Sequence, residues 1–127
     1  MSQHIVVDVE MNDEEAILDA LGNMGYSPVV HEKPVSINFY NNKDIKANIV
    51  VSKTQCGFRY GDLGFEKTSA GYKMHIDDID QRSFNMSKLK QGYSEAKIKK
   101  SIKGKSKFMI KNRQEVDGKI KITIRVR

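Results

Sequence analysis

Cationic side chains near the C-terminus have a spacing that favours anion binding. In the final segment, KIKITIRVR, Lys119 to Arg127, aliphatic and cationic residues alternate, with Thr123 as the one interruption. This period of two is typical of a β-strand, which places the aliphatic side chains on one face and the cationic ones on the other. A cationic face of this kind attracts phosphates and carboxylates.

The segment before it has the same period, so the two segments predict a β-hairpin. We expect a three-residue loop, Val116 to Gly118, because that loop gathers the cations on one face. The resulting register pairs Glu115 with Lys119 and Arg113 with Lys121. Lysines that protect a sheet edge from aggregation are the structural alternative. The predicted anion-binding face holds Lys107, Lys111, Arg113, Lys119, Lys121, Arg125 and Arg127.

A helix is expected between Asp80 and Gly104, because apolar residues recur there at intervals of three and four. Gly92 lies inside this predicted helix, where glycine is less favourable than alanine by about 1 kcal/mol. Lys97 and Lys100 are added to the predicted anion-binding residues, although cations in the closing turns also complement the helix dipole. The apolar stripe comprises Met86, Leu89, Tyr93 and Ala96, widened at its end by Ile98 and Ile102.

Charge is divided unevenly along the chain. Residues 1–81 hold 7 basic and 13 acidic side chains, a balance of −6, whereas residues 82–127 hold 15 basic and 3 acidic ones, a balance of +12. An uneven distribution of this kind steers anionic partners toward one end of a protein. We predict a single domain over residues 1–127, in which a cationic C-terminal helix–hairpin module, residues 82–127, is attached to an acidic body.

The loop from Gln55 to Asp62 is a second candidate site. Its glycines allow a ligand to approach the backbone, Phe58 and Tyr60 offer stacking surfaces, and Arg59 supplies a planar donor fork for phosphate. These three residues define a small-nucleotide pocket as an alternative site. A hairpin loop that needs glycine and buries its aromatic residues is the competing structural explanation.

Residues with catalytic or metal-binding chemistry are few and scattered. Cys56 and His75 form a conceivable nucleophile–base pair across a hairpin, whereas free cysteines are commonly inert packing groups. An acidic run fits either a hard cation or a solvated turn: Asp77, Asp78 and Asp80. The three histidines are interpreted as ordinary strand residues: His4, His31 and His75. Glycine-rich phosphate loops are absent, and we predict no enzyme, no metal and no cofactor.

Length and composition fit one folded domain. The 127 residues are 39% apolar and 30% charged, and the lone Cys56 cannot form an internal disulfide, which fits a reducing compartment. The N-terminus has no basic leader, and its apolar run ends at Asp8, so we expect neither a signal peptide nor a membrane span. We therefore expect a soluble protein of the cytoplasm, of the plastid stroma, or of a host cytoplasm if the source is a virus.

The acidic body predicts a strand, a helix and a series of short strands. Residues 4–11 alternate as a half-buried strand, and Asn12 is the expected N-cap of the helix that follows, with Glu15 as its capping-box partner and Gly25 as its left-handed end. Strands are expected at residues 26–30, 35–40 and 45–52, the last two joined as a hairpin, and Pro34 makes a central position in the sheet unlikely for its segment.

A second hairpin turns at Ser69 to Gly71. It places Leu63 and Phe65 on one strand and Tyr72, Met74 and Ile76 on the next, all with period two. The predicted class is α+β, a mainly antiparallel sheet with two helices in the order β-α-β-β-β-β-β-α-β-β.

Several short motifs resemble one family over most of the chain. They are Lys46 to Val51, Gly61 to Phe65 with Gly71-Tyr72 and Asp77-Asp78, Lys88 to Tyr93, and Asp117 to Ile120. The chain is similar here to the plastid hypothetical-reading-frame family numbered thirty-five, which also occurs in cyanobacteria, other bacteria and some viruses. It departs from that family in Gly92 and in its basic tail. The resemblance implies no catalytic residues, and an association of some members with an AAA ATPase and a ferredoxin suggests an adaptor role.

The leading hypothesis is a non-enzymatic binding protein that engages RNA or single-stranded DNA through the cationic face. One alternative is a binder of a small nucleotide, in which Arg59 and the aromatic residues hold the base and the phosphate; a homodimer interface is a candidate position for this site. The other is an adaptor whose cationic face docks on an acidic protein surface.

Overall fold

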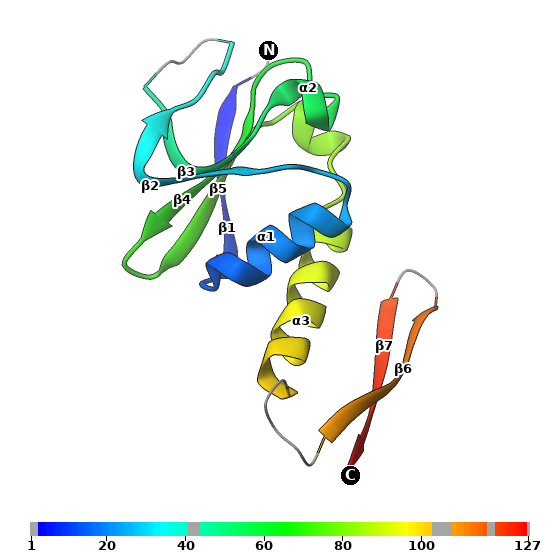
Figure 1. Cartoon of the computed structure of the whole chain (residues 1–127). Coiled ribbons are helices and arrows are strands. Elements are labelled where there is room, and N and C mark those ends of the chain that lie inside the picture. The colour runs from blue at the N-terminus through cyan, green and yellow to red at the C-terminus, as the bar shows by residue number, and fades with distance from the viewer. Residues whose placement is uncertain (1–2, 41–43, 103–107, 117–118, 127) are drawn as a thin grey trace.

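Five strands form one antiparallel sheet, shown in Figure 1. The computed structural model describes residues 3–40, 44–102, 108–116 and 119–126, with side chains described as far as residue 102. The strand order is β1-β5-β4-β3-β2, so β1 and β2 are edge strands, and the predicted α+β class is confirmed. The strands are β1 (His4–Met11), β2 (Val29–Ser36), β3 (Lys46–Val51), β4 (Leu63–Thr68) and β5 (Gly71–Asp77).

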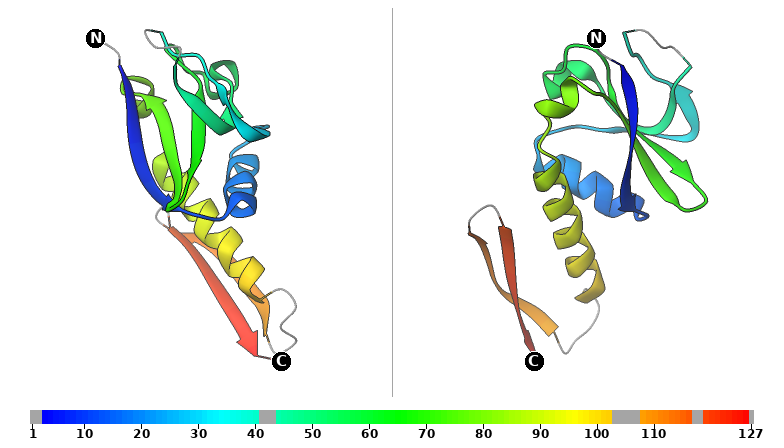
Figure 2. Two further views of the ribbon diagram at one scale, coloured as in Figure 1. Left: turned by 90° about the vertical axis from the view of Figure 1, so that its left-hand side faces the viewer. Right: turned by 180° about the vertical axis from the view of Figure 1, so that it is seen from behind.

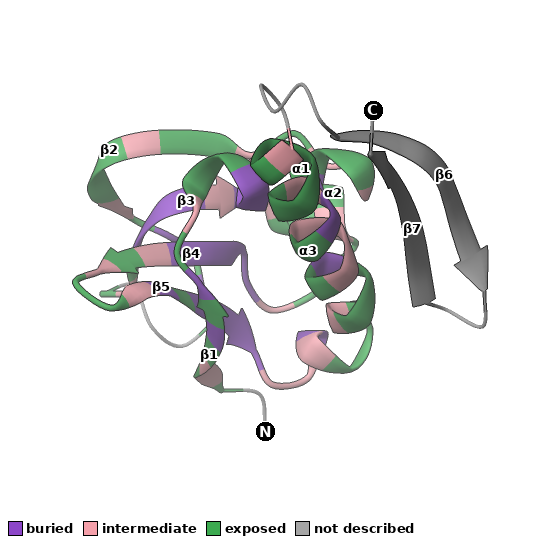
Figure 3. Ribbon diagram, turned by 90° about the horizontal axis from the view of Figure 1, so that it is seen from below, coloured by how far each residue is buried: buried purple, intermediate pink, exposed green. Residues whose placement is uncertain are grey.

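Two long helices lie together on one side of the sheet (Figure 2). Helix α1 (Glu14–Asn23) follows β1, α3 (Met86–Ile102) follows β5, and the two helices contact each other. Two short helices lie in connections, α2 (Lys53–Cys56) and η1 (Asp80–Arg82). Figure 3 shows buried residues concentrated on β3, β4 and β5 and on parts of both long helices. The largest fully buried side chains are Phe65, Ile17, Leu21, Ile49, Leu63, Met74, Ile76, Leu89 and Val51.

Helix α1 has a different N-cap from the predicted one. Asp13 is the N-cap, and its Oδ1 accepts the N–H of Ala16 at 3.1 Å. The prediction that Asn12 caps the helix with Glu15 as its partner is wrong, because the side chain of Asn12 accepts a hydrogen bond from the hydroxyl of Tyr93 at 3.3 Å. A contact between residues far apart in the sequence therefore displaced the local capping pattern.

The C-terminal end of α1 is a left-handed glycine turn, as predicted. Gly25 has a φ of 91°, and its N–H donates to the carbonyl of Gly22 at 3.0 Å. The N–H of Tyr26 donates to the carbonyl of Leu21 at 3.1 Å. This pair of hydrogen bonds satisfies carbonyls that the end of a helix otherwise leaves without partners.

Strand β2 replaces two predicted strands, residues 26–30 and 35–40. The chain forms one strand there, so the predicted element order contains one strand too many. The pairing of β2 with β3 changes register between Val30 and Val35, an interval that contains Pro34. Because proline has no N–H to donate, an edge position suits it, as the sequence predicted.

Asn48 bridges the interrupted pairing between β2 and β3. Its Nδ2 donates to the carbonyls of His31 at 3.3 Å and Glu32 at 3.2 Å, and its Oδ1 accepts the N–H of Lys67 from β4 at 2.9 Å. One buried amide thus takes the place of ladder hydrogen bonds on both sides of β3. Alternating hydrophobicity cannot indicate such a role, because it reports only which face of a sheet a side chain occupies.

The β4–β5 hairpin confirms the second predicted hairpin with a shorter turn. Thr68 pairs with Gly71, so Ser69 and Ala70 alone connect the strands. Gly71 has a φ of 126°, a conformation that other residues rarely adopt. The apolar residues that alternate along the two strands are all buried: Leu63, Phe65, Tyr72, Met74 and Ile76.

A smaller apolar cluster covers the other face of the sheet. Gly64 lies between two core residues of β4, so a side chain at this position would point to that second face. An added Cβ would lie 2.6 Å from Ile37 Cδ1 and 2.8 Å from Ala47 Cβ. The cluster comprises Ile37, Phe39 and Ala47, with Ile45 and Val50 packed against it.

The contact between α1 and α3 explains the glycine inside α3. A Cβ on Gly92 would lie 3.1 Å from the Cβ and 3.2 Å from the Cα of Ala20, so the two helices approach backbone to backbone. Leu89 is fully buried on the predicted stripe, whereas Ile98 is 37% exposed and its assignment to the stripe is wrong. The predicted stop of this helix at Gly104 lies outside the described residues.

We expect Gly92→Leu to destabilise the protein by about 1–3 kcal/mol, because overpacking outweighs the gain in helix propensity. Chemical denaturation monitored by circular dichroism measures the change. Gly22→Ala in α1 is the control, because nothing lies within 4 Å of its added Cβ, and we expect it to stabilise by up to about 1 kcal/mol. Equal stability of Gly92→Leu and the parent protein would contradict close packing at this contact.

Candidate anion-binding site

The last two strands form a separate hairpin beside α3. Among the described strands, β6 (Phe108–Val116) and β7 (Lys119–Val126) pair only with each other, and both contact α3 (Figure 1). Both views of Figure 2 place the hairpin along the helix and away from the five-stranded sheet. The two elements that carry the predicted cations are therefore neighbours.

The register of this hairpin agrees with the prediction at its open end and departs from it near the turn. Phe108 pairs with Val126 and Ile110 with Ile124, as the predicted alternation requires. The register shifts after Ile110. An irregularity of this kind adds a residue to one strand and reverses the alternation beyond it.

Near the turn the predicted pairings are wrong. Val116, not Glu115, is the partner of Lys119, and Arg113 lies opposite Ile122 instead of Lys121. The observed register therefore avoids the direct opposition of Arg113 and Lys121, and like charges directly opposite each other destabilise a strand pair. Lys107, Arg127 and the loop residues 117–118 lie outside the described residues.

The other predicted binding residues of the hairpin are located only by their backbone. Arg125 pairs with Met109, and Lys121 pairs with Gln114. Lys111 lies where the register shifts, between Ile110 and Asn112. The cationic face itself stays a prediction, because side chains beyond residue 102 are not described.

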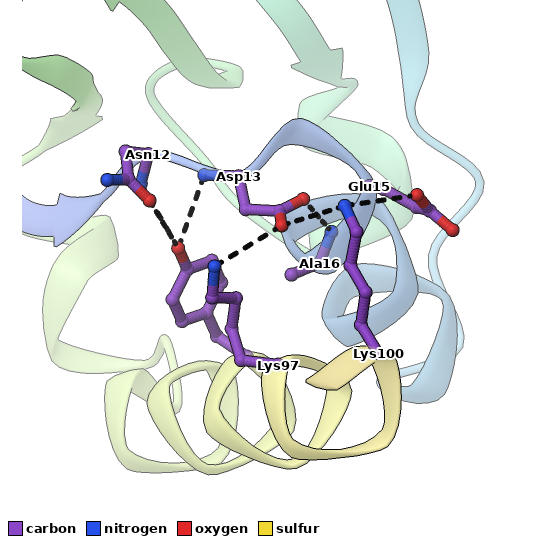
Figure 4. Close-up of polar contacts among 7 residues, drawn as sticks. Asn12, Asp13, Glu15, Ala16, Lys97 and Lys100 are labelled. Atoms are coloured by element: carbon purple, nitrogen blue, oxygen red, sulfur yellow. Dashed lines mark hydrogen bonds and ion pairs between the residues drawn. The ribbon is translucent and has the colours of Figure 1, made fainter. Parts of the chain in front are cut away.

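The two predicted anion-binding lysines of α3 already hold a carboxylate. Figure 4 shows both side chains reaching the start of α1, where Asp13 Oδ2 lies 3.4 Å from Lys97 Nζ and 3.0 Å from Lys100 Nζ. Lys100 also lies 3.4 Å from Glu15 Oε2. Both lysines lie on one helix face because they are three positions apart in the sequence.

The environment of Asp13 stabilises its charged form. The hydrogen bond from the Ala16 N–H and the neighbouring Lys100 lower the pKa of the Asp13 carboxyl below its usual value. The hydrogen bonds to Asp13 and Glu15 raise the pKa of Lys100. The hydroxyl of Tyr93 accepts the N–H of Asp13 at 3.2 Å, which fixes the backbone that carries the carboxylate.

The candidate nucleotide loop is organised by Asp80. The carboxylate of Asp80 accepts the N–H groups of Arg59 at 2.9 Å, Tyr60 at 3.0 Å and Gly61 at 3.2 Å. Phe58 is buried and packs edge-on against the ring of Phe84, so it belongs to the core. The side chain of Arg59 is exposed and that of Tyr60 is half-buried.

We expect Asp80→Ala to destabilise the protein by about 3 kcal/mol, because three N–H donors lose a buried acceptor and each unsatisfied group costs about 1–3 kcal/mol. Asp80→Asn keeps one acceptor oxygen, so its loss should be smaller. Asp19→Asn in α1 is the control for the loss of one negative charge. Urea denaturation measures all three, and a loss no larger than that of the control would contradict the assigned role.

Cys56 does not have the environment of a nucleophile. Burial, followed by the charges of Asp62 and Asp80, raises the pKa of its thiol to about 12. A reactive cysteine requires the opposite shift. The two ring nitrogens of His75, its predicted partner, bond to His4 and Glu66 instead.

Two histidines meet on the sheet, which sequence reasoning missed. His4 Nε2 lies 2.7 Å from His75 Nδ1, the rings stack, and His75 Nε2 lies 2.8 Å from Glu66 Oε1. The strand pairing could have suggested this contact, because His4 pairs with Asp77 and side chains two residues apart on neighbouring strands are diagonal neighbours. Partial burial, then His75, lowers the pKa of His4, while Asp77 opposes the shift.

We expect the free energy of unfolding to fall as the pH drops below about 6.5 toward 5. A histidine with a lowered pKa in the folded state binds a proton more readily when unfolded, so protonation favours unfolding. Thermal unfolding between pH 5 and 7.5 measures this, and His4→Gln should flatten the dependence whereas His31→Gln should not. Identical pH profiles for these two variants would contradict the prediction.

The acidic run bonds to the backbone. Asp78 accepts the N–H of Gln3 at 2.9 Å, and Asp77 accepts the N–H of Ile79 at 2.9 Å. Within the described residues, no group of three or more His, Cys, Asp or Glu has the arrangement of a metal site. No helix in that part of the chain combines the length and apolar character needed to cross a membrane.

The fold and the candidate site define a small α+β protein. Two helices cover one face of an antiparallel sheet, and a hairpin that is rich in basic residues contacts the second helix. The chain belongs to the DUF1257 family, described as proteins of unknown function, which it matches over residues 20–123. Neither a curated protein nor a solved structure matches the chain.

Proposed function

We propose that this protein is a non-enzymatic binding module that engages RNA or single-stranded DNA through residues 82–127. The observation that carries the proposal is the balance of 15 basic and 3 acidic side chains in this segment. Contacts with phosphates dominate the affinity of sequence-independent binding, and lysine and arginine supply them. The exposed side chains of Lys88 and Lys90 add to the cations on α3.

The arrangement of the cationic elements supports this proposal. Strands β6 and β7 lie beside α3, so both elements can meet one extended polyanion. Residues 1–81 carry a balance of −6, which favours one orientation of an anionic partner. The proposal includes kinship with the plastid family numbered thirty-five. It also includes a location in the cytoplasm, in the plastid stroma, or in a host cytoplasm if the source is a virus.

Two other partners remain alternatives within the same electrostatic scheme. A small nucleotide would use the exposed Arg59 and the ring of Tyr60, which lies edge-on 6.2 Å from Tyr40. An acidic protein surface would dock on the same cationic segment and make the protein an adaptor. The burial of Phe58 leaves fewer stacking groups for the nucleotide, which is why we favour the polyanion.

We expect the protein to bind a fluorescent single-stranded RNA, with an affinity that falls about a hundredfold between roughly 50 and 200 mM salt. That loss corresponds to about five phosphate contacts, because the slope for single strands is about −0.7 per phosphate. Fluorescence anisotropy measures the binding. Charge reversal by Lys121→Glu and Arg125→Glu together should weaken binding about tenfold or more.

Reversal of two exposed lysines of the acidic body, Lys33→Glu and Lys46→Glu, is the matched control, because it changes the net charge equally. Equal weakening by both pairs would show that net charge and not the C-terminal segment governs binding. Absence of RNA and DNA binding at low salt would overturn the proposal in favour of the alternative partners.

A further inference from the structure

We propose that Lys97 and Lys100 form a phosphate-binding subsite that Asp13 occupies in the free protein. The inference rests on the proposed function and adds a regulation to it. A phosphate of the bound strand would replace the carboxylate of Asp13 at the two lysines. The free protein therefore binds nucleic acid more weakly than its lysines would permit.

The contacts of Asp13 resemble those of a bound anion. One oxygen, Oδ1, accepts the N–H of Ala16 in the first turn of α1, while Oδ2 faces the ammonium groups of Lys97 and Lys100. A helix N-terminus together with lysines is a common environment for phosphate groups. Asp13 thus makes, inside the protein, the contacts that an external phosphate requires.

Exposure makes the exchange physically feasible. The side chains of Lys97 and Lys100 are 46% and 51% exposed, whereas that of Asp13 is 12% exposed. Each lysine has a flexible stem, so its ammonium group can turn toward solvent while the carboxylate stays at its cap. Solvent screens ion pairs whose lysines are about half exposed, so a multiply charged strand can compete with them.

The surroundings favour Asp13 while no ligand is bound. A shallow hollow beside Lys100 is lined by Glu15 and Asp19 from α1 and by Lys99 from α3. These carboxylates repel an isolated phosphate, and Lys99 is held by Glu95 at 3.1 Å. A polyanion that already contacts the hairpin brings its phosphates to the subsite at a high local concentration, which a free phosphate ion does not.

The test compares Asp13→Asn with Glu14→Gln by anisotropy with the same single-stranded RNA over a series of salt concentrations. Asparagine caps a helix about as well as aspartate, so the first variant keeps α1 and removes the charge. Glu14 is exposed in the same turn, so the second variant removes an equal charge nearby. Circular dichroism and thermal unfolding verify that both variants keep the fold.

We expect Asp13→Asn to tighten RNA binding about two- to fivefold, which corresponds to the strength of exposed ion pairs. The slope of log K against log salt should steepen by about 0.7 for each phosphate that gains a contact. Glu14→Gln should change the affinity less than twofold and leave the slope unchanged. Lys97→Gln with Lys100→Gln should remove the gain when combined with Asp13→Asn.

Two outcomes separate the inference from the function beneath it. If the parent protein binds RNA but Asp13→Asn and Glu14→Gln have equal effects, Asp13 acts only as a general charge and the subsite is overturned. If the parent protein and every variant fail to bind RNA or single-stranded DNA at low salt, the proposed function falls and the subsite falls with it.

Discussion

The close contact between α1 and α3, at Ala20 and Gly92, is the constraint on which the other features depend. Both helices cover the same face of the sheet, and residues with little or no side chain let their backbones approach. That approach brings Tyr93 to the chain before α1, where its hydroxyl meets two backbone N–H groups. It also brings Lys97 and Lys100 to Asp13. The polar junction in Figure 4 thus follows from the packing of the two helices.

Carboxylates hold the loops and helix ends of this protein together. Asp80 accepts three N–H groups of the loop before β4, and Asp62 accepts those of Asn38 at 3.1 Å and Lys53 at 2.8 Å. Asp13 caps α1 in the same manner. Buried N–H groups need acceptors, and an ionised carboxylate is a strong one. Acidic residues that the sequence alone offers as candidate metal ligands or catalytic groups therefore accept hydrogen bonds from backbone N–H groups.

Acidic and basic residues are separated along the chain, but some of them meet in the folded protein. The acidic and cationic parts are not simply two opposed ends, because α3 lies against α1 and its lysines meet acidic residues there. Their charge is partly compensated inside the molecule. The hairpin β6–β7 contacts α3. Within the cationic segment, α3 thus joins the hairpin to the acidic body.

The sequence alone determined the periodic features of the fold. Alternation of period two identified β1 and the β4–β5 hairpin, recurrence at three and four identified α3, and a capping pattern that ends at Gly25 indicated α1. Gly25 and Pro34 marked a helix end and an edge strand, because each residue restricts its own backbone. For the candidate site, the same periodicity found the lysines of α3 and the pairing at the open end of the last hairpin.

Tertiary structure decided which side chains meet. Asn48 bridges strands, Asp13 displaces Asn12 as the cap, and His4 stacks on His75 across 71 positions of sequence. The ion pairs of Lys97 and Lys100 with Asp13 are also contacts between residues far apart in the sequence. Local periodicity reports only the face that a residue occupies. Partners across the fold are set by helix approach and strand register, which depend on the packing of the whole chain.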